Sequence, residues 1–109
     1  MITKDFVHSM IETASDEKRK HIIGRACVAV FQYQTAAEKT TNDTRVYNDE
    51  GFTSADAREG SLTAKYYLKH GTLHEWQVDK WVRVNKKGTM RIAKYWRQLD
   101  RAARAKAAA

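Results

Sequence analysis

The sequence predicts an all-α fold, with four to five short helices packed in one compact domain. Proline is absent from all 109 residues, only five glycines occur, and helix-favouring alanine, lysine, arginine and leucine are frequent. A chain of this length can bury one hydrophobic core but is too short for two. We therefore expect a single helical domain over residues 1–104, followed by an alanine-rich tail, residues 105–109, that frays.

Two helices are expected in the N-terminal part of the chain. The first covers Lys4 to Thr13 and turns Phe6 and Met10 toward the core. The second begins after Ser15, whose hydroxyl can cap a helix and which precedes two acidic residues that suit a helix N-terminus. Its apolar positions, from Ile22 to Phe31, mark it as the central helix of the domain.

The short apolar run from Ala26 to Phe31 is also compatible with a buried strand, and the length of the whole segment favours the helix. Cys27 lies in this run and is the only cysteine, so it cannot form an internal disulfide and is expected to be a buried small hydrophobic residue. No signal peptide or membrane-spanning stretch is visible, and the expected location is the cytoplasm of a bacterial host cell.

A polar segment from Thr41 to Gly51, rich in turn-forming residues, predicts the longest loop. The third helix should begin at a hydroxyl cap, either Thr53 or Ser54, and end at Gly71. Gly60 falls inside this helix and predicts close packing against a neighbouring element.

Thr72 and Glu75 have the spacing of a capping box, which predicts a fourth helix over about Leu73 to Val82. The alternative for this region is a hairpin, because apolar residues alternate with polar and bulky ones from Val78 to Val84.

The last helix is predicted over residues 89–106, after a turn at residues 85–88 and with Thr89 as its cap. Together with the preceding helix it gives a helix-turn-helix-like C-terminal half. At the helical period its apolar residues share one side, namely Ile92, Tyr95, Trp96, Leu99, Ala102 and Ala103. Four cations share the other side with no acidic residue expected among them, namely Lys94, Arg97, Arg101 and Arg104.

Charge is distributed unevenly over the chain, whose formal net charge is +7. Residues 1–60 carry eight Lys and Arg against ten Asp and Glu, whereas residues 61–98 carry nine against two. A basic C-terminal half favours a polyanionic partner, either nucleic acid or an acidic protein surface, over a small-molecule substrate. A solvated basic face without a ligand is the plain alternative.

Eight cations are the expected phosphate-binding residues, namely Arg83, Lys86, Lys87, Arg91, Lys94, Arg97, Arg101 and Arg104. Arg91, Lys94 and Arg97 are suitable for reading bases if the last helix enters a DNA major groove, but the long basic turn favours general backbone binding. Four aromatic residues interleaved with these cations could stack on bases of a single strand, although helical spacing also suits the core; they are Trp76, Trp81, Tyr95 and Trp96.

Enzymatic patterns are poor in this sequence. His70 and His74 are four residues apart, but the Gly71 stop places them on different helices and only one cysteine is available to complete a metal site. Asp56 and Glu59 are explained as surface acids. We expect no catalytic residues, no metal and no cofactor.

Several short motifs carry a resemblance to known proteins. They are Gln34-Thr35 with Glu38, Gly51-Phe52 with Asp56-Ala57, Gly60-Ser61-Leu62 with Ala64, and Gln77, Lys94-Tyr95 and Gln98-Leu99. Over residues 22–99 the chain resembles a small module of phage, plasmid and integrated-element proteins, and is similar to a segment that accompanies helicases of the Swi/Snf type. The resemblance implies an accessory domain that acts on DNA, with Phe52 buried and Asp56 in or near the first turn of a helix. The resemblance carries over no known catalytic activity to this chain.

The sequence-based hypothesis is therefore a non-enzymatic nucleic-acid-binding accessory protein of a phage or mobile element, with DNA as the expected ligand. The alternative is a protein that inhibits or modulates a host defence or DNA-processing enzyme by docking the same basic patch on an acidic host surface. Both hypotheses use the same cations, and neither involves a membrane.

Overall fold

The computed structural model describes residues 2–41 and 51–108, and the side chains of residues 2–33 and 51–107. Its elements are, in chain order, α1 (Lys4–Thr13), α2 (Asp16–Thr41), α3 (Ala57–His70), α4 (Glu75–Val82), the 3-10 helix η1 (Ala93–Tyr95) and α5 (Trp96–Ala108). Over these described residues the β structure is limited to an isolated bridge between Val84 and Met90. The all-α prediction is confirmed.

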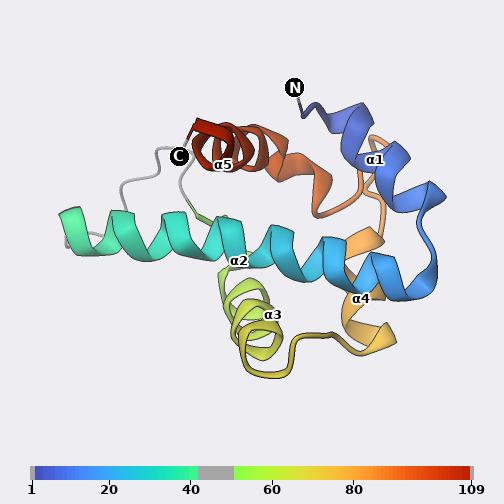
Figure 1. Ribbon diagram of the computed structural model, residues 1–109, viewed down its shortest axis with the longest axis horizontal. Helices are drawn as coiled ribbons and strands as arrows, with labels where there is room; N and C mark the ends of the chain where they lie inside the picture. The colour runs from blue at the N-terminus through green and yellow to red at the C-terminus, as the bar shows by residue number, and fades with distance from the viewer. Residues whose placement is uncertain (1, 42–50, 109) are drawn as a thin grey trace.

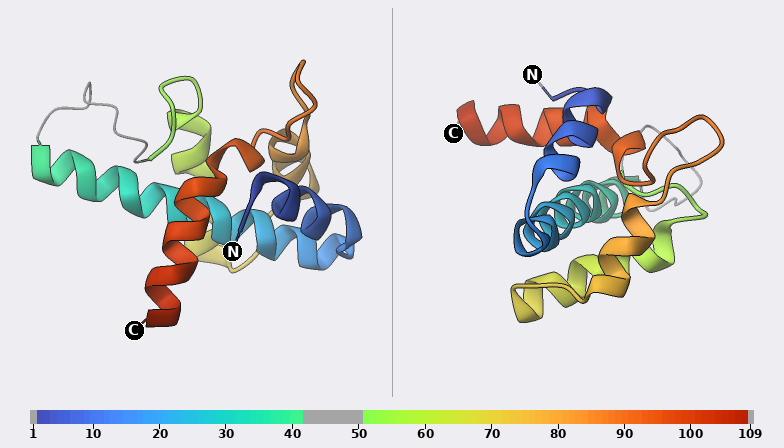
Figure 2. Two further views of the ribbon diagram at one scale, coloured as in Figure 1. Left: turned by 90° about the horizontal axis from the view of Figure 1, so that it is seen from above. Right: turned by 90° about the vertical axis from the view of Figure 1, so that its right-hand side faces the viewer.

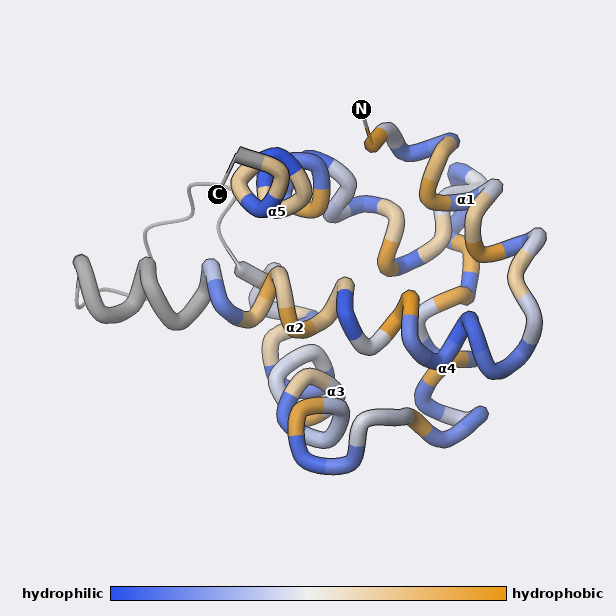
Figure 3. The backbone as a smooth tube through the Cα atoms, in the orientation of Figure 1, coloured by the Kyte–Doolittle hydropathy of each residue, from blue (hydrophilic) through white to orange (hydrophobic). Residues whose placement is uncertain are grey.

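The long helix α2 is the centre of the molecule. In Figure 1 it crosses the view with α5 above it and α3 below it, while α1 and α4 lie near its N-terminal end. The end-on view in Figure 2 places α1 and α5 on one side of α2 and α3 and α4 on the other. Along α2 the chain changes from hydrophilic in the first turns to more hydrophobic in the middle, where it is covered from both sides (Figure 3).

The first two helices follow local signals in the sequence. Helix α1 has the predicted bounds, and its N-cap Thr3 accepts a hydrogen bond from the Phe6 N–H at 3.1 Å. Val7 and Ile11, four residues apart, form its buried stripe, whereas the expectation for Phe6 is wrong because its side chain is 48% exposed. Ser15 caps α2 as predicted, accepting from the Lys18 N–H at 3.3 Å.

Two glycines let aromatic rings approach the backbone of a neighbouring helix. A Cβ atom at Gly24 in α2 would lie 2.1 Å from a ring carbon of Tyr67, and one at Gly60 in α3 would lie 2.5 Å from the ring of Phe52. Both contacts therefore depend on the missing side chain. The close packing predicted at Gly60 is confirmed.

Helix α3 begins at Ala57, later than either predicted hydroxyl cap. Asp56 occupies the N-cap position without capping through its side chain, and its backbone N–H donates to Thr53 O at 3.0 Å in the preceding turn. The C-terminus is as predicted, because Gly71 adopts a left-handed conformation with φ of 71° and donates to Tyr67 O at 2.8 Å.

The predicted capping box at the start of the fourth helix is wrong. Helix α4 begins at Glu75, after His74, whose N–H donates to Gln77 Oε1 at 2.8 Å. Gln77 thus takes the role expected of Glu75. Leu73 is 2% exposed, so this residue is anchored in the core before the helix starts. The hairpin alternative over Val78 to Val84 is also wrong, since α4 continues to Val82.

The continuous last helix is the largest error of the sequence-based prediction. Residues 83–92 fold back on themselves, with Arg91 N–H donating to Arg83 O at 2.8 Å and Ile92 N–H donating to Trp81 O at 3.0 Å. Because these groups are paired outside a helix, Thr89 caps nothing and α5 starts only at Trp96. The connection of residues 83–95 is longer than the turn of a helix-turn-helix motif. The C-terminal half therefore does not form the helix-turn-helix-like arrangement that the sequence predicted.

The buried hydrophobic core is formed by residues of α1 to α4, of η1 and of the connections, and α5 adds the partly buried Trp96 and Leu99. The core's largest fully buried side chains are Trp81, Ile23, Ile92, Val7, Val30 and Cys27. The N-terminus is tied down as well, since the Ile2 N–H donates to Asp100 Oδ1 at 2.8 Å and the Met90 N–H donates to His8 Nε2 at 3.1 Å. In the described ranges, every helix is too short or too polar to span a lipid bilayer.

Candidate functional site

Three of the eight predicted phosphate-binding cations lie on the exposed turn after α4, which we call the basic turn (Arg83, Lys86 and Lys87). Asn85 shapes this turn by accepting at Oδ1 from the N–H groups of Lys87, at 2.8 Å, and Thr89, at 3.1 Å. Gly88 closes it with φ of 78° and donates to Asn85 O at 3.0 Å. The predicted turn is confirmed, and the lysine side chains play no part in its shape.

Two further predicted cations lie in a cluster around Asp56, which is 4% exposed. Arg91 Nε donates to Asp56 Oδ1 at 2.9 Å, and Lys94 Nζ lies 2.6 Å from Asp56 Oδ2. Tyr95 donates its hydroxyl to the same Oδ2 at 2.5 Å, and Arg91 also pairs with Glu59 Oε2 at 2.7 Å. We call these five residues the Asp56 cluster.

The electrostatics of the Asp56 cluster favour the charged forms of its carboxylates and the neutral form of Tyr95. Burial disfavours the Asp56 carboxylate, but hydrogen bonds from Lys94, Tyr95 and Arg91 outweigh burial and hold its pKa below the ordinary value. A hydrogen bond from Arg91 likewise lowers the pKa of Glu59. Burial and the bond to Asp56 raise the pKa of Tyr95, which therefore stays a hydroxyl donor.

Arg91 is held on a third side by an aromatic ring. Its guanidinium carbon lies 4.3 Å from the ring centroid of Trp81, whose Nε1 donates to Thr63 Oγ1 at 3.2 Å. Arg91 and Lys94 are thus engaged inside the domain, and a phosphate would have to compete with Asp56 for both of them.

The remaining three predicted cations lie on α5. Arg104 pairs with Asp100 at 3.0 Å one turn earlier, so the expectation of a stripe without acids is wrong. Arg97 lies over the ring of Trp96 at 5.1 Å, and Arg101 lies over the ring of Tyr33 in α2 at 4.1 Å. The predicted line of four cations is not complete, because Lys94 lies in η1 and binds Asp56, while only Arg97, Arg101 and Arg104 lie on α5.

Several of the motifs that carried the resemblance meet where α3 begins beside η1 and α5, whereas the side chains of Gln34, Thr35 and Glu38 lie outside the described ones. Gly51 and Gln98 exchange two hydrogen bonds, from Gly51 N to Oε1 at 2.8 Å and from Nε2 to Gly51 O at 3.1 Å. Phe52 is buried between Gly60, Trp81 and Tyr95. Burial of Phe52 and the place of Asp56 just before α3 agree with what the resemblance implied, and the contacts of these residues join segments far apart in the chain.

Sequence reasoning missed a basic stripe along the outer side of α3. Arg58, Leu62, Lys65 and Lys69 are all exposed, and their spacing of four, three and four residues places them in line. Leu62 and Leu68 are 59% and 62% exposed, which is high for leucine. The spacing was visible in the sequence, but the face of α3 that α2 covers was not.

Sequence reasoning also missed an aromatic group at the junction of α3 and α4. Tyr66 contacts His70 with ring centroids 4.2 Å apart and contacts His74 at 5.2 Å, and its hydroxyl lies 2.8 Å from His74 Nε2. The ring of His74 is nearly parallel to that of Trp76, at 14° and 6.0 Å. Among the described side chains no group of three or more His, Cys, Asp or Glu is arranged for a metal ion.

Several exposed acidic residues lie around a hollow that is separate from the basic turn and from the outer side of α3. This hollow of about 330 Å³ lies between α4 and the junction of α1 with α2, over an apolar floor that includes Ile11 and Val78. Its acidic lining residues are Glu12, Asp16, Glu75 and Asp79. Arg19 and Lys20 also line the hollow, and Arg19 lies 3.5 Å from Asp16, so four acids face two cations where α1, α2 and α4 meet.

Comparisons with known proteins add no assignment: no family model matches the sequence, and neither the curated proteins nor the solved structures searched gave a match. The fold and surface thus define the chain as a small all-α domain with an internal ionic cluster, a basic turn, and basic residues along α3 and α5.

Proposed function

We propose that this chain is a non-enzymatic nucleic-acid-binding accessory protein that contacts phosphate groups through its basic turn, assisted by the arginines of α5. The observation that carries the proposal is the state of Arg83, Lys86 and Lys87. These side chains are exposed and form no ion pair with any residue in the described ranges. Cations that neither pair internally nor shape their own turn are available to a polyanion.

The division of the predicted cations supports this choice of residues. Arg91 and Lys94 are engaged with Asp56, and releasing them would leave a buried carboxylate without partners. Arg97 and Arg104 are in more exposed settings, where a contact with a ring or with Asp100 costs little to exchange for phosphate, and Arg101 is exposed over the ring of Tyr33. We expect these three to assist the turn.

The test replaces Lys86 and Lys87 together with Ala. Binding to both duplex and single-stranded DNA should weaken, and the slope of log affinity against log salt should flatten by roughly one for each phosphate that the variant no longer binds. The matched control is the double substitution to Arg, which keeps both charges and should keep the affinity. Stability of both variants should stay within about 0.5 kcal/mol of wild type, since the turn is shaped by Asn85 and Gly88.

Equal affinity of the Ala and wild-type proteins would refute the basic turn as the binding site. Absence of any nucleic-acid binding at low salt would refute the function itself. In that event the same pair of variants should be compared for capture of host proteins after nuclease treatment. A specific partner captured by wild type and by the Arg variant, but not by the Ala variant, would then support the rival function, docking on an acidic protein surface.

A further inference from the structure

One tryptophan of this chain is placed for contact with a ligand. Of the four aromatic residues interleaved with the C-terminal cations, Trp81 and Tyr95 are 0% and 3% exposed and belong to the core. Trp96 is half-buried beneath Arg97. Trp76, in the first turn of α4, is 57% exposed. An indole this exposed contributes little to the core, so its ring can be used at the surface.

The ring of Trp76 belongs to a pre-positioned group. It stacks on His74, and the backbone of His74 is fixed by its hydrogen bond to Gln77. The His74 ring is also held through Nε2, 2.8 Å from the hydroxyl of Tyr66 on α3. Rings held on helices lose little conformational entropy when a flat ligand stacks on them.

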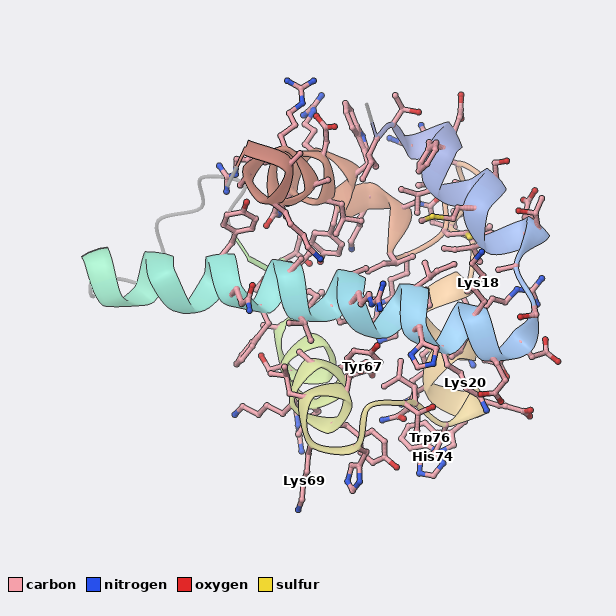
Figure 4. All side chains as sticks on the ribbon, in the orientation of Figure 1. Lys18, Lys20, Tyr67, Lys69, His74 and Trp76 are labelled. Atoms are coloured by element: carbon pink, nitrogen blue, oxygen red, sulfur yellow. The ribbon has the colours of Figure 1, made fainter. Side chains whose placement is uncertain are left out.

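Cations lie on the two helices that carry this group. Lys80 lies over the Trp76 ring at 5.1 Å, with its Nζ 3.9 Å from Glu59 Oε1 at the partly exposed end of the Asp56 cluster, and Lys69 is exposed in the last turn of α3. In Figure 4, Lys69 lies at the lower end of α3, His74 and Trp76 lie near the start of α4, and Lys18 and Lys20 lie on α2. We call Tyr66, Lys69, His74, Trp76 and Lys80 the aromatic–basic face. It is distinct from the basic turn, which follows the opposite end of α4.

The charge of the face is positive despite two acidic neighbours of Trp76 in the sequence. Glu75 and Asp79 both line the hollow toward α1 and α2. On α3, the side chains of Arg58 and Lys69 are exposed without an ion pair in the described part of the chain. The helix's own acid, Glu59, is bound by Arg91 at 2.7 Å and lies 3.9 Å from Lys80. A ligand of this face should therefore combine negative charge with flat rings.

We propose that the aromatic–basic face binds single-stranded nucleic acid, with an unpaired base stacked at Trp76 and neighbouring phosphates contacted by Lys69 and Lys80. An unpaired base can present its ring to an indole, whereas bases in a duplex are already stacked on each other. The inference rests on the proposed function in taking nucleic acid as the ligand, but it uses different residues and specifies the strand form.

The test measures tryptophan fluorescence and affinity with a short oligothymidylate and with a blunt duplex of similar length. The single strand should quench the exposed Trp76 emission, and W76L should lower its affinity by between about fivefold and a hundredfold. W76F keeps a ring and should recover most of the affinity. K69A should flatten the salt dependence for the single strand. Each variant should unfold at the same urea concentration as wild type, because both side chains are exposed.

The outcomes separate the two proposals. If W76L binds the single strand as tightly as wild type, or if W76F loses as much affinity as W76L, the stacking site is overturned while the basic turn stays open to its own test. If the single strand binds through Trp76 but the Lys86 and Lys87 substitutions change nothing, the stacking site stands and the turn is refuted. If wild type binds neither ligand, both proposals fail.

Discussion

The Asp56 cluster gives the strongest stability prediction. Replacing Asp56 with Ala removes the shared partner of Arg91, Lys94 and Tyr95 at once. The carboxylate side chain is 6% exposed, whereas those of Arg91 and Lys94 are 23% and 38% exposed. Both cations can therefore regain some water in the variant, whereas the hydroxyl of Tyr95, a residue that is 3% exposed, loses its carboxylate acceptor and keeps, among the described residues, only its contacts with Thr53.

The magnitude follows from these burials. Removing one partner of a buried ion pair costs about 3–5 kcal/mol, and the partial exposure of the two cations places this variant near the lower limit. A loss of about 3 kcal/mol is a large fraction of the roughly 5–15 kcal/mol that stabilises a domain. The melting temperature should fall by about 10–20 °C.

Urea unfolding followed by tryptophan fluorescence measures this loss directly. D79A is the matched control, because Asp79 is exposed, lies on α4 and makes no ion pair in the described ranges. It should change stability by no more than about 0.5 kcal/mol. If D56A costs less than about 1 kcal/mol while the control behaves as expected, the reasoning about this cluster is wrong.

The same cluster predicts the direction of a pH effect. The folded-state pKa of Asp56 is below its ordinary value, so its contribution is fully present above about pH 4, the usual pKa of the unfolded carboxyl, and is lost as pH falls through the lower folded value. The stability gap between wild type and D56A should therefore narrow on acidification below about pH 4. A gap that widens there would contradict the cluster's role.

Three other measurements test the packing. Gly24→Ala should destabilise the domain by about 1–3 kcal/mol in urea unfolding despite the better helix propensity of Ala, because the new Cβ meets the Tyr67 ring at 2.1 Å; an unchanged midpoint would contradict the close crossing of α2 and α3. Gln98→Ala should cost about 1–3 kcal/mol by leaving two buried backbone groups of Gly51 unpaired, and a thermal melt identical to wild type would refute that bond pair. Cys27 should resist thiol reagents until the protein unfolds, since burial raises its pKa; rapid labelling of native protein would show that α2 is not central.

Local features of the fold could be predicted because they depend on a few neighbouring residues. The start of α1, the cap at Ser15 and the stop at Gly71 depend on side-chain caps or on glycine conformation within one helical turn. The turn closed by Asn85 and Gly88 is of the same kind. These signals act within one helical turn and do not depend on how the rest of the chain folds.

The residue at which α5 starts and the binding partners of Arg91 and Lys94 could not be predicted in this way. Both cations have the right spacing to extend a basic helical stripe, but they bind an aspartate more than thirty residues earlier in the chain. The backbone near Arg91 is then held by Arg83 and Trp81 and is not helical. Periodicity reports which side chains could share a face, and it does not report a partner brought close only by the folded chain.

The internal ion pairs also change how the net charge should be interpreted. In the Asp56 cluster two cations meet two carboxylates, so the cluster adds nothing to the net charge of +7, and the excess must lie elsewhere in the chain. Among the described residues, exposed acids collect around the hollow beside α4, while cations without such neighbours occupy the outer side of α3 and the basic turn. A polyanion approaching the protein would be attracted more strongly at the other two surfaces than at the hollow, where acids outnumber cations. Ligand orientation thus depends on where the acids are concentrated as much as on the number of cations.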